Sequence, residues 1–122
     1  MKILIIEDEW IIAYDLKLIL KGLGYNVVGT ADNGKDALEY TKKMKPDIIL
    51  VDIKLKGRMS GIEAAHHIFR EYRIPVIYVT AFLDSETMQQ AMLTHPIAYL
   101  NKPFTEPELE DALIKVSGKS TF

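Results

Sequence analysis

The chain of 122 residues contains no cysteine, little net charge and no long apolar segment. Without cysteine it can form neither disulfides nor thiolate metal sites, which suits a cytoplasmic protein. The formal net charge of -2 gives no reason to expect nucleic-acid binding, which needs a concentrated basic surface. The apolar runs are only a few residues long, too short to span a bilayer, and Met1 and Lys2 show no signal-peptide pattern.

The overall composition is that of one globular domain. Hydrophobic residues make up 48% of the sequence and charged residues 26%, both ordinary values for a folded soluble protein. The length lies within the usual range for a domain with its own core. We therefore expect one domain over residues 1–122, with a core of about 2–117 and a short polar tail at 118–122.

Short runs rich in Ile and Val alternate with stretches of helical spacing. This alternation is typical of βα units that build a parallel sheet covered on both faces. We expect a doubly wound, flavodoxin-like (βα)5 domain of class α/β, with the five strands in the order 2-1-3-4-5. The predicted strands are 3–6, 26–31, 47–52, 75–80 and 97–101, and the predicted helices are about 9–22, 34–45, 61–72, 85–95 and 106–117.

Helix ends and helix faces can be assigned from residue types. Asp8 is a candidate N-cap of the first helix, and Thr105 with Glu108 forms a candidate capping box for the last. Met88 and Met92 lie one turn apart in the fourth helix and are expected in the core, with a partner surface as the alternative. The apolar residues assigned to the first helix are Trp10, Ile11, Tyr14, Leu18 and Ile19.

Polar residues follow the apolar runs where each run ends. Glu7 and Asp8 follow the first strand, and Asp52 follows the third. Thr80 ends the fourth strand, and Lys102 comes just after the fifth. Parallel strands bring their carboxyl ends to one edge of the sheet, where open α/β sheets place their sites. Two neighbouring carboxylates about 4 Å apart repel by roughly 4 kcal/mol at an effective dielectric near 20. A hard divalent ion, Mg²⁺ above all or Mn²⁺, would compensate such an acid cluster.

Each of these residues alone has an ordinary structural explanation. Asp8 can be a helix cap, Thr80 a β-branched strand residue, and Lys102 a surface lysine. Together they describe carboxylate phosphorylation, in which Asp52 attacks while the metal and Lys102 neutralise the charge on the transferred group. Ala81 directly after Thr80 leaves space beside the phosphoryl group.

At these residues the chain resembles a response-regulator receiver domain of two-component signalling, similar to the chemotaxis regulators. The resemblance runs from Ile3 to about Val116. It implies that Asp52 is the phosphoacceptor for a sensor histidine kinase or a histidine phosphotransfer protein. It also implies that Asp8 and Asp52 bind Mg²⁺ together with the backbone carbonyl of Lys54, and that Glu7 acts through a water.

The same resemblance assigns the remaining roles. Lys102, Thr80 and Ala81 would contact the phosphate, and family members usually have a cis peptide before the proline equivalent to Pro103. Thr80 and Tyr99 would form a switch pair that alters the surface of the fourth helix, fifth strand and fifth helix, where a downstream protein docks. Tyr99 can equally be a half-buried core aromatic. A phosphorylation-dependent dimer is one option, and no membrane contact is expected.

The chain departs from the family pattern after Asp52. The loop over residues 54–61 lacks the usual proline and is about one residue longer, with Ser60 where an acid is common. Lys54 and Phe82 stand two residues past Asp52 and Thr80, beside the expected phosphoryl group. Our hypothesis is that Phe82 hinders attacking water and lengthens the phosphorylated lifetime, in which case Phe82→Ala speeds the loss of the label.

Three alternatives belong to other functional classes. A flavin binder of this topology needs a phosphate cradle after the first strand, where Glu7 and Asp8 would repel a phosphate. A Mg²⁺-dependent aspartyl-phosphate phosphatase wants a second Asp two positions after the nucleophile, where this chain has Lys54. A receiver that serves as an unphosphorylated interaction module would not need the complete charged set. The sequence does not distinguish a stand-alone regulator from part of a longer protein, and a multiple-turnover enzyme is not expected.

Overall fold

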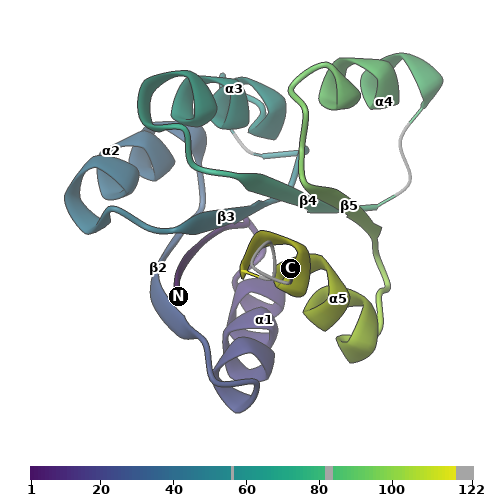
Figure 1. The fold of residues 1–122 in the computed structure, drawn as a ribbon. Coiled ribbons are helices and arrows are strands. Elements are labelled where there is room, and N and C mark those ends of the chain that lie inside the picture. Colours follow the sequence, from purple (N-terminus) through teal and green to yellow (C-terminus); the bar gives the residue numbers. More distant parts are fainter. Residues whose placement is uncertain (56, 82–83, 118–122) are drawn as a thin grey trace.

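The computed structural model describes residues 1–55, 57–81 and 84–117. Within them five parallel strands form one sheet in the order β2-β1-β3-β4-β5, as the sequence predicts (Figure 1). The strands are β1 (Lys2–Ile6), β2 (Asn26–Ala31), β3 (Ile48–Val51), β4 (Val76–Thr80) and β5 (Ala98–Asn101). The helices are α1 (Trp10–Gly22), α2 (Gly34–Met44), α3 (Gly61–Tyr72), α4 (Ser85–Met92) and α5 (Glu106–Ser117).

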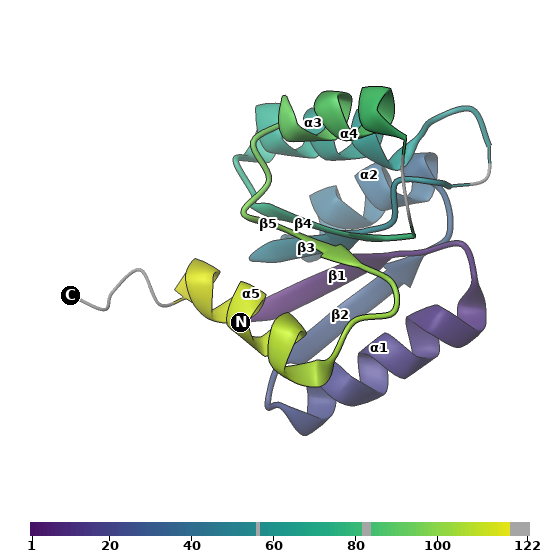
Figure 2. The ribbon, with the colours of Figure 1, turned by 90° about the vertical axis from the view of Figure 1, so that its right-hand side faces the viewer.

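Helices cover both faces of the sheet. Figure 2 shows α2, α3 and α4 on one face and α1 and α5 on the other. The central strands β1 and β3 are buried on both sides, which explains why they are apolar without a break. Along β1, Leu4 and Ile6 join the cluster under α2, α3 and α4, while Ile3 and Ile5 join the cluster under α1 and α5. Because all five strands are parallel, the loops after β1, β3 and β5 lie at the same edge of the sheet (Figure 2).

The apolar face predicted for α1 is largely wrong. The helix buries Ala13, Leu16 and Leu20. These residues have helical spacing, and the small side chain of Ala13 lets the helix approach the sheet closely. Four residues assigned to this helix are instead exposed: Trp10 by 75%, Ile11 by 64%, Tyr14 by 56% and Leu18 by 50%.

One of the two predicted N-caps is found and the other is not. The prediction that Asp8 caps α1 is wrong, because Glu9 is the N-cap residue and its side chain makes no cap bond. In α5, the Thr105 and Glu108 capping box is confirmed by bonds of 2.8 and 3.2 Å. The longer loop after β3 ends in a capping box that was not foreseen, between Ser60 and Glu63.

The helix α4 is shorter than predicted. It ends at Met92, because the N–H groups of Leu93 and Thr94 close its last turn and His95 takes a left-handed φ of 54°. Ala91 is its one buried residue, so the core assignment of Met92 is wrong: that side chain is 41% exposed. Among the described residues, none of the helices has the length and apolar character needed to cross a bilayer.

Candidate functional site

The backbone hydrogen bonds of the sheet continue for one residue beyond the ends of β3 and β5. The N–H of Asp52 donates to the carbonyl of Ile6 at 2.9 Å, so β1 fixes the residue that follows β3. In the same way the N–H of Lys102 donates to the carbonyl of Thr80 at 2.9 Å. The predicted site residues are thus held at the carboxyl edge by main-chain bonds of the sheet itself.

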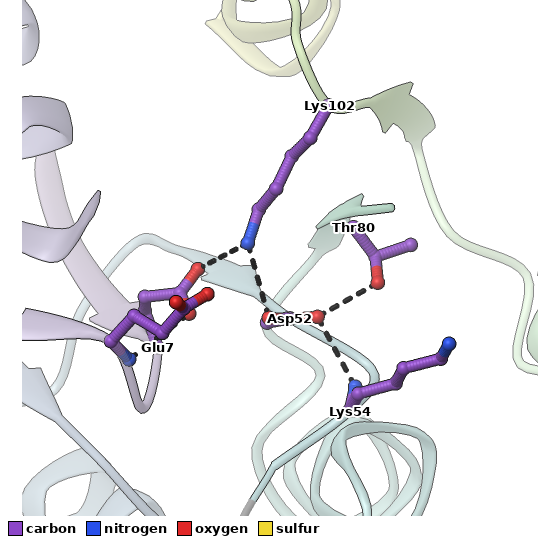
Figure 3. A network of polar contacts seen from close by, with 6 residues as sticks. Glu7, Asp52, Lys54, Thr80 and Lys102 are labelled. Carbon is purple, nitrogen blue, oxygen red and sulfur yellow. Dashed lines mark hydrogen bonds and ion pairs between the residues drawn. The ribbon is translucent and has the colours of Figure 1, made fainter. Parts of the chain in front are cut away.

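Asp52 lies at the centre of the polar residues at this edge (Figure 3). Its Oδ1 accepts a hydrogen bond from Thr80 Oγ1 at 2.7 Å and one from the backbone N–H of Lys54 at 3.1 Å. Its Oδ2 accepts from Lys102 Nζ at 3.1 Å. The residue is only 7% exposed. The structure therefore brings Asp52, Thr80 and Lys102 together, as the strand ends predict.

Lys102 also bonds a second carboxylate. Its Nζ lies 2.7 Å from Glu7 Oε1, and the Glu7 side chain is almost completely buried. Burial raises the pKa of Glu7 to about 7, helped by the charge of Asp52 and opposed by the bond from Lys102. Burial alone would lower the pKa of Lys102, but the bonds to Glu7 and Asp52 outweigh it and raise that pKa. The ammonium group partly offsets the repulsion between the two acids.

Three acids form a group that could hold a cation. Glu7, Asp8 and Asp52 each offer a carboxylate oxygen, and these atoms lie within 4.8 Å of one another. A single lysine does not neutralise three carboxylates, so the electrostatic cost identified in the sequence persists in the folded chain. Oxygen donors only, at the mouth of a partly exposed site, fit a hard divalent ion such as Mg²⁺.

Gly61, the first residue of α3, lies directly behind Asp52. A Cβ atom on this residue would stand 2.0 Å from the carbonyl oxygen of Asp52 and 2.7 Å from the Cα of Ile53. The N–H of Gly61 donates to the carbonyl of Ile53 at 2.8 Å. Only glycine permits this approach, so the start of α3 supports the backbone of Asp52. The sequence shows a glycine at this position but carries no signal for the contact.

The comparison with known proteins agrees with this geometry. Residues 3–114 match the response regulator receiver domain family. The chain belongs to this family.

Individual receiver proteins and structures are similar over nearly the whole chain. The transcriptional regulatory protein PdtaR of Mycobacterium tuberculosis is 37% identical over 112 residues, which cover 92% of this chain and 54% of PdtaR. The chemotaxis protein CheY of Thermotoga maritima is 32% identical, with 95% of this chain and 97% of CheY covered. A signal receiver domain of a modulated diguanylate cyclase from Desulfovibrio desulfuricans G20 has a TM-score of 0.91 at 36% identity, covering 98% and 96% of the two chains. The chain spans about half the length of the first curated relatives it matches.

Other predicted residues of this receiver domain lie around the acids with different orientations. Lys54 directs its side chain away from Asp52, although its backbone N–H bonds that carboxylate (Figure 3). Ala81 is exposed beside the site. The peptide bond between Lys102 and Pro103 is cis, as the family resemblance implies. Phe82 lies outside the described residues, so the hypothesis about its bulk stays a prediction.

Tyr99 is half-buried at the edge of the receiver core. It pairs with Tyr78 across β4 and β5 and packs against the cluster under α3 and α4. Its hydroxyl oxygen is shielded from solvent and has no hydrogen-bond partner among the described residues. Burial and the charge of Asp52 raise the pKa of Tyr99 above its ordinary value. The ring thus lies in the layer shared by Thr80 and α4.

Proposed function

We propose that this receiver domain is a phosphorylation-controlled switch in a two-component phosphorelay. Asp52 would accept the phosphoryl group from a phosphohistidine of a sensor histidine kinase or a histidine phosphotransfer protein. A carboxylate oxygen forms the new P–O bond while the P–N bond breaks, and the imidazole leaves with the bonding electron pair. The observation that carries this proposal is the convergence of Lys102 Nζ and Thr80 Oγ1 on the two oxygens of Asp52, at 3.1 and 2.7 Å.

The surrounding residues would stabilise the transferred group. Lys102 supplies a positive charge, and Thr80 with the backbone beside Ala81 supplies hydrogen bonds to its oxygens. Asp8, Asp52 and the carbonyl of Lys54 would hold Mg²⁺ or Mn²⁺, which would neutralise charge on the phosphoryl oxygens. Glu7 suits a role through a water, because its Oε1 already bonds Lys102 at 2.7 Å.

The output of the switch would be a protein surface. Thr80 would turn to the phosphoryl group, Tyr99 would take up the space left behind, and the α4-β5-α5 surface would change. Exposed apolar residues at one end of this surface support docking of a downstream protein. These residues are Met92, Leu93 and Ile97, which are 41%, 75% and 39% exposed. Such a domain assists its own phosphorylation and dephosphorylation and does not turn over an external substrate; we place it in the cytoplasm.

The test is phosphorylation with acetyl phosphate and Mg²⁺, followed by intact-mass measurement. We expect one added phosphoryl group on the wild-type chain and none on Asp52→Ala. Asp111→Ala is the matched control, because it removes an exposed carboxylate of α5 that is not part of the acid cluster, and it should be phosphorylated like the wild type. Equal mass gain in Asp52→Ala, or no gain in the wild type, would contradict the proposal.

A further inference from the structure

Hydroxyl groups connect the C-terminal end of α4 to the sheet. The Tyr78 hydroxyl lies 2.6 Å from Thr94 Oγ1, and Thr94 Oγ1 donates to the carbonyl of Ala91 at 2.6 Å. A threonine hydroxyl has one proton, which Thr94 uses on Ala91, so Tyr78 is the donor of the other bond. The Tyr78 hydroxyl carries its proton at neutral pH, because its ordinary pKa is 10.0 and burial raises this pKa further. A continuous donor chain therefore runs from β4 to the last turn of α4.

The helix α4 is short and buries little against the described part of the chain. It is eight residues long, and Ala91 is its one buried residue. The last carbonyls of any helix lack helical partners and need others. Here the carbonyl of Ala91 accepts from the backbone N–H of Thr94 at 3.1 Å and from the Thr94 hydroxyl at 2.6 Å, and the fully buried Tyr78 bonds that hydroxyl from the sheet.

The donor chain lies next to the residues proposed to switch. Tyr78 precedes Thr80 by two positions in β4, so the two side chains point to the same face of the sheet. Tyr78 is also the register partner of Tyr99. All three lie under α3 and α4, on the face away from α1 and α5. Thr80, Tyr99 and the donor chain therefore share the layer between the sheet and α4.

We propose that the hydroxyl pair of Tyr78 and Thr94 is a latch that holds the C-terminal end of α4 on the sheet, so that α4 responds to phosphorylation about this fixed end. The latch itself does not depend on phosphorylation, whereas the movement of α4 on phosphorylation rests on the proposed function. The latch would also hold the exposed apolar residues Met92 and Leu93 in place while the opposite end of the helix, beside the phosphorylation site, moves.

Amide hydrogen exchange of the unphosphorylated chain tests the latch. In Tyr78→Phe and in Thr94→Val we expect amides of α4 to exchange about three- to tenfold faster, the factor that loss of one hydrogen bond produces. Amides of α2 serve as the internal reference and should change much less. Thr94→Ser keeps the hydroxyl and should restore exchange to about the wild-type rate. Tyr72→Phe removes an exposed hydroxyl from α3 and is the matched control without effect on α4.

Two outcomes would overturn the latch. One is equal acceleration in α2 and α4, since this would show a general loss of stability. The other is unchanged exchange in α4 of both hydroxyl-deleted variants. The double variant Tyr78→Phe with Thr94→Val adds a further criterion: its effect should stay well below the sum of the single effects, because both changes break the same bond.

The phosphorylated chain tests the fixed end. With acetyl phosphate and Mg²⁺ we expect exchange to change more at residues 85–88 than at residues 89–92 of the wild type, and we expect Tyr78→Phe to lose this difference. A larger change at residues 89–92 of the wild type would refute the fixed end. If mass measurement finds no phosphoryl group on Asp52, the proposed function fails, while the comparison of unphosphorylated variants still decides the latch.

Discussion

The two sides of the carboxyl edge are built differently. On the acid side, α3 begins with a capping box, buries four residues and touches the backbone of Asp52 through Gly61. On the switch side, α4 buries one residue and is tied at its far end by hydroxyl groups. Groups that bind a metal or a phosphate must be held within a fraction of an ångström, whereas an element that changes position must have low local stability. Under the proposed function, this difference would assign the chemistry at Asp52 to the rigid side and the motion to the lightly held side.

The largest expected effect comes from disturbing the rigid side at Gly61. In Gly61→Ala the new Cβ would meet backbone atoms of Asp52, which cannot rotate away as a side chain could. We expect the free energy of unfolding to fall by about 3 kcal/mol, at the upper end for overpacking, and phosphorylation of Asp52 to slow. Urea denaturation and intact-mass measurement check the two effects.

The chain offers a matched glycine as control for this substitution. A Cβ on Gly22, the last residue of α1, would meet no atom within 4 Å. Gly22→Ala should therefore leave phosphorylation unchanged and stabilise the chain by up to about 1 kcal/mol, since alanine favours the helix and restricts the unfolded chain. Equal stability of the two variants would show that the support behind Asp52 is not rigid.

The second effect, of intermediate size, concerns the charge balance on the acid side. Glu7 has an ordinary pKa of 4.5 in the unfolded chain and a pKa of about 7 in the folded chain. Between these values the folded chain binds more protons, so its free energy of unfolding falls as the pH rises. In Glu7→Gln this loss is absent. We expect the variant to gain about 1–2 kcal/mol relative to the wild type between about pH 5 and about pH 8, after allowing for solvent screening.

Denaturation without divalent cations measures this difference. Loss of the bond to Lys102 lowers the free energy of unfolding of Glu7→Gln at every pH. Only the change in this free energy between about pH 5 and about pH 8 is therefore diagnostic. Glu110→Gln, on an exposed position of α5, is the control whose stability should parallel the wild type. If the free energy of unfolding changed with pH in the same way for the wild type and Glu7→Gln, burial would not raise the pKa of Glu7.

The sequence was sufficient to predict the strand order and the meeting of Asp52, Thr80 and Lys102. The reason is topological: uninterrupted apolar runs predict buried parallel strands, and parallel strands place whatever follows them at one edge. No side-chain geometry is needed for that step.

Side-chain choices that depend on tertiary contact were not accessible in the same way. Both faces of α1 carry apolar residues, and only packing shows that Ala13 faces the sheet while Trp10 does not. The Lys102 ammonium group bonds both Glu7 and Asp52, and Gly61 closely approaches the backbone of Asp52. Both contacts depend on distances between segments far apart in the sequence. From the sequence, Tyr78 is only an aromatic residue of a strand. The bond of its hydroxyl to Thr94 Oγ1, at 2.6 Å, is known only from the structure.

The smallest expected effect on stability lies on the switch side, at Thr80. Thr80→Val keeps the shape of this fully buried residue and removes the bond to Asp52 Oδ1, which still accepts from the N–H of Lys54. We expect a loss of about 1 kcal/mol in urea denaturation. The variant should still gain a phosphoryl group, because Asp52 and Lys102 are untouched, yet exchange in α4 should no longer respond to it. Thr80→Ser retains the hydroxyl and should keep that response. A full response of α4 in Thr80→Val would show that the signal leaves the rigid side by another route, and the division between the two sides would fail.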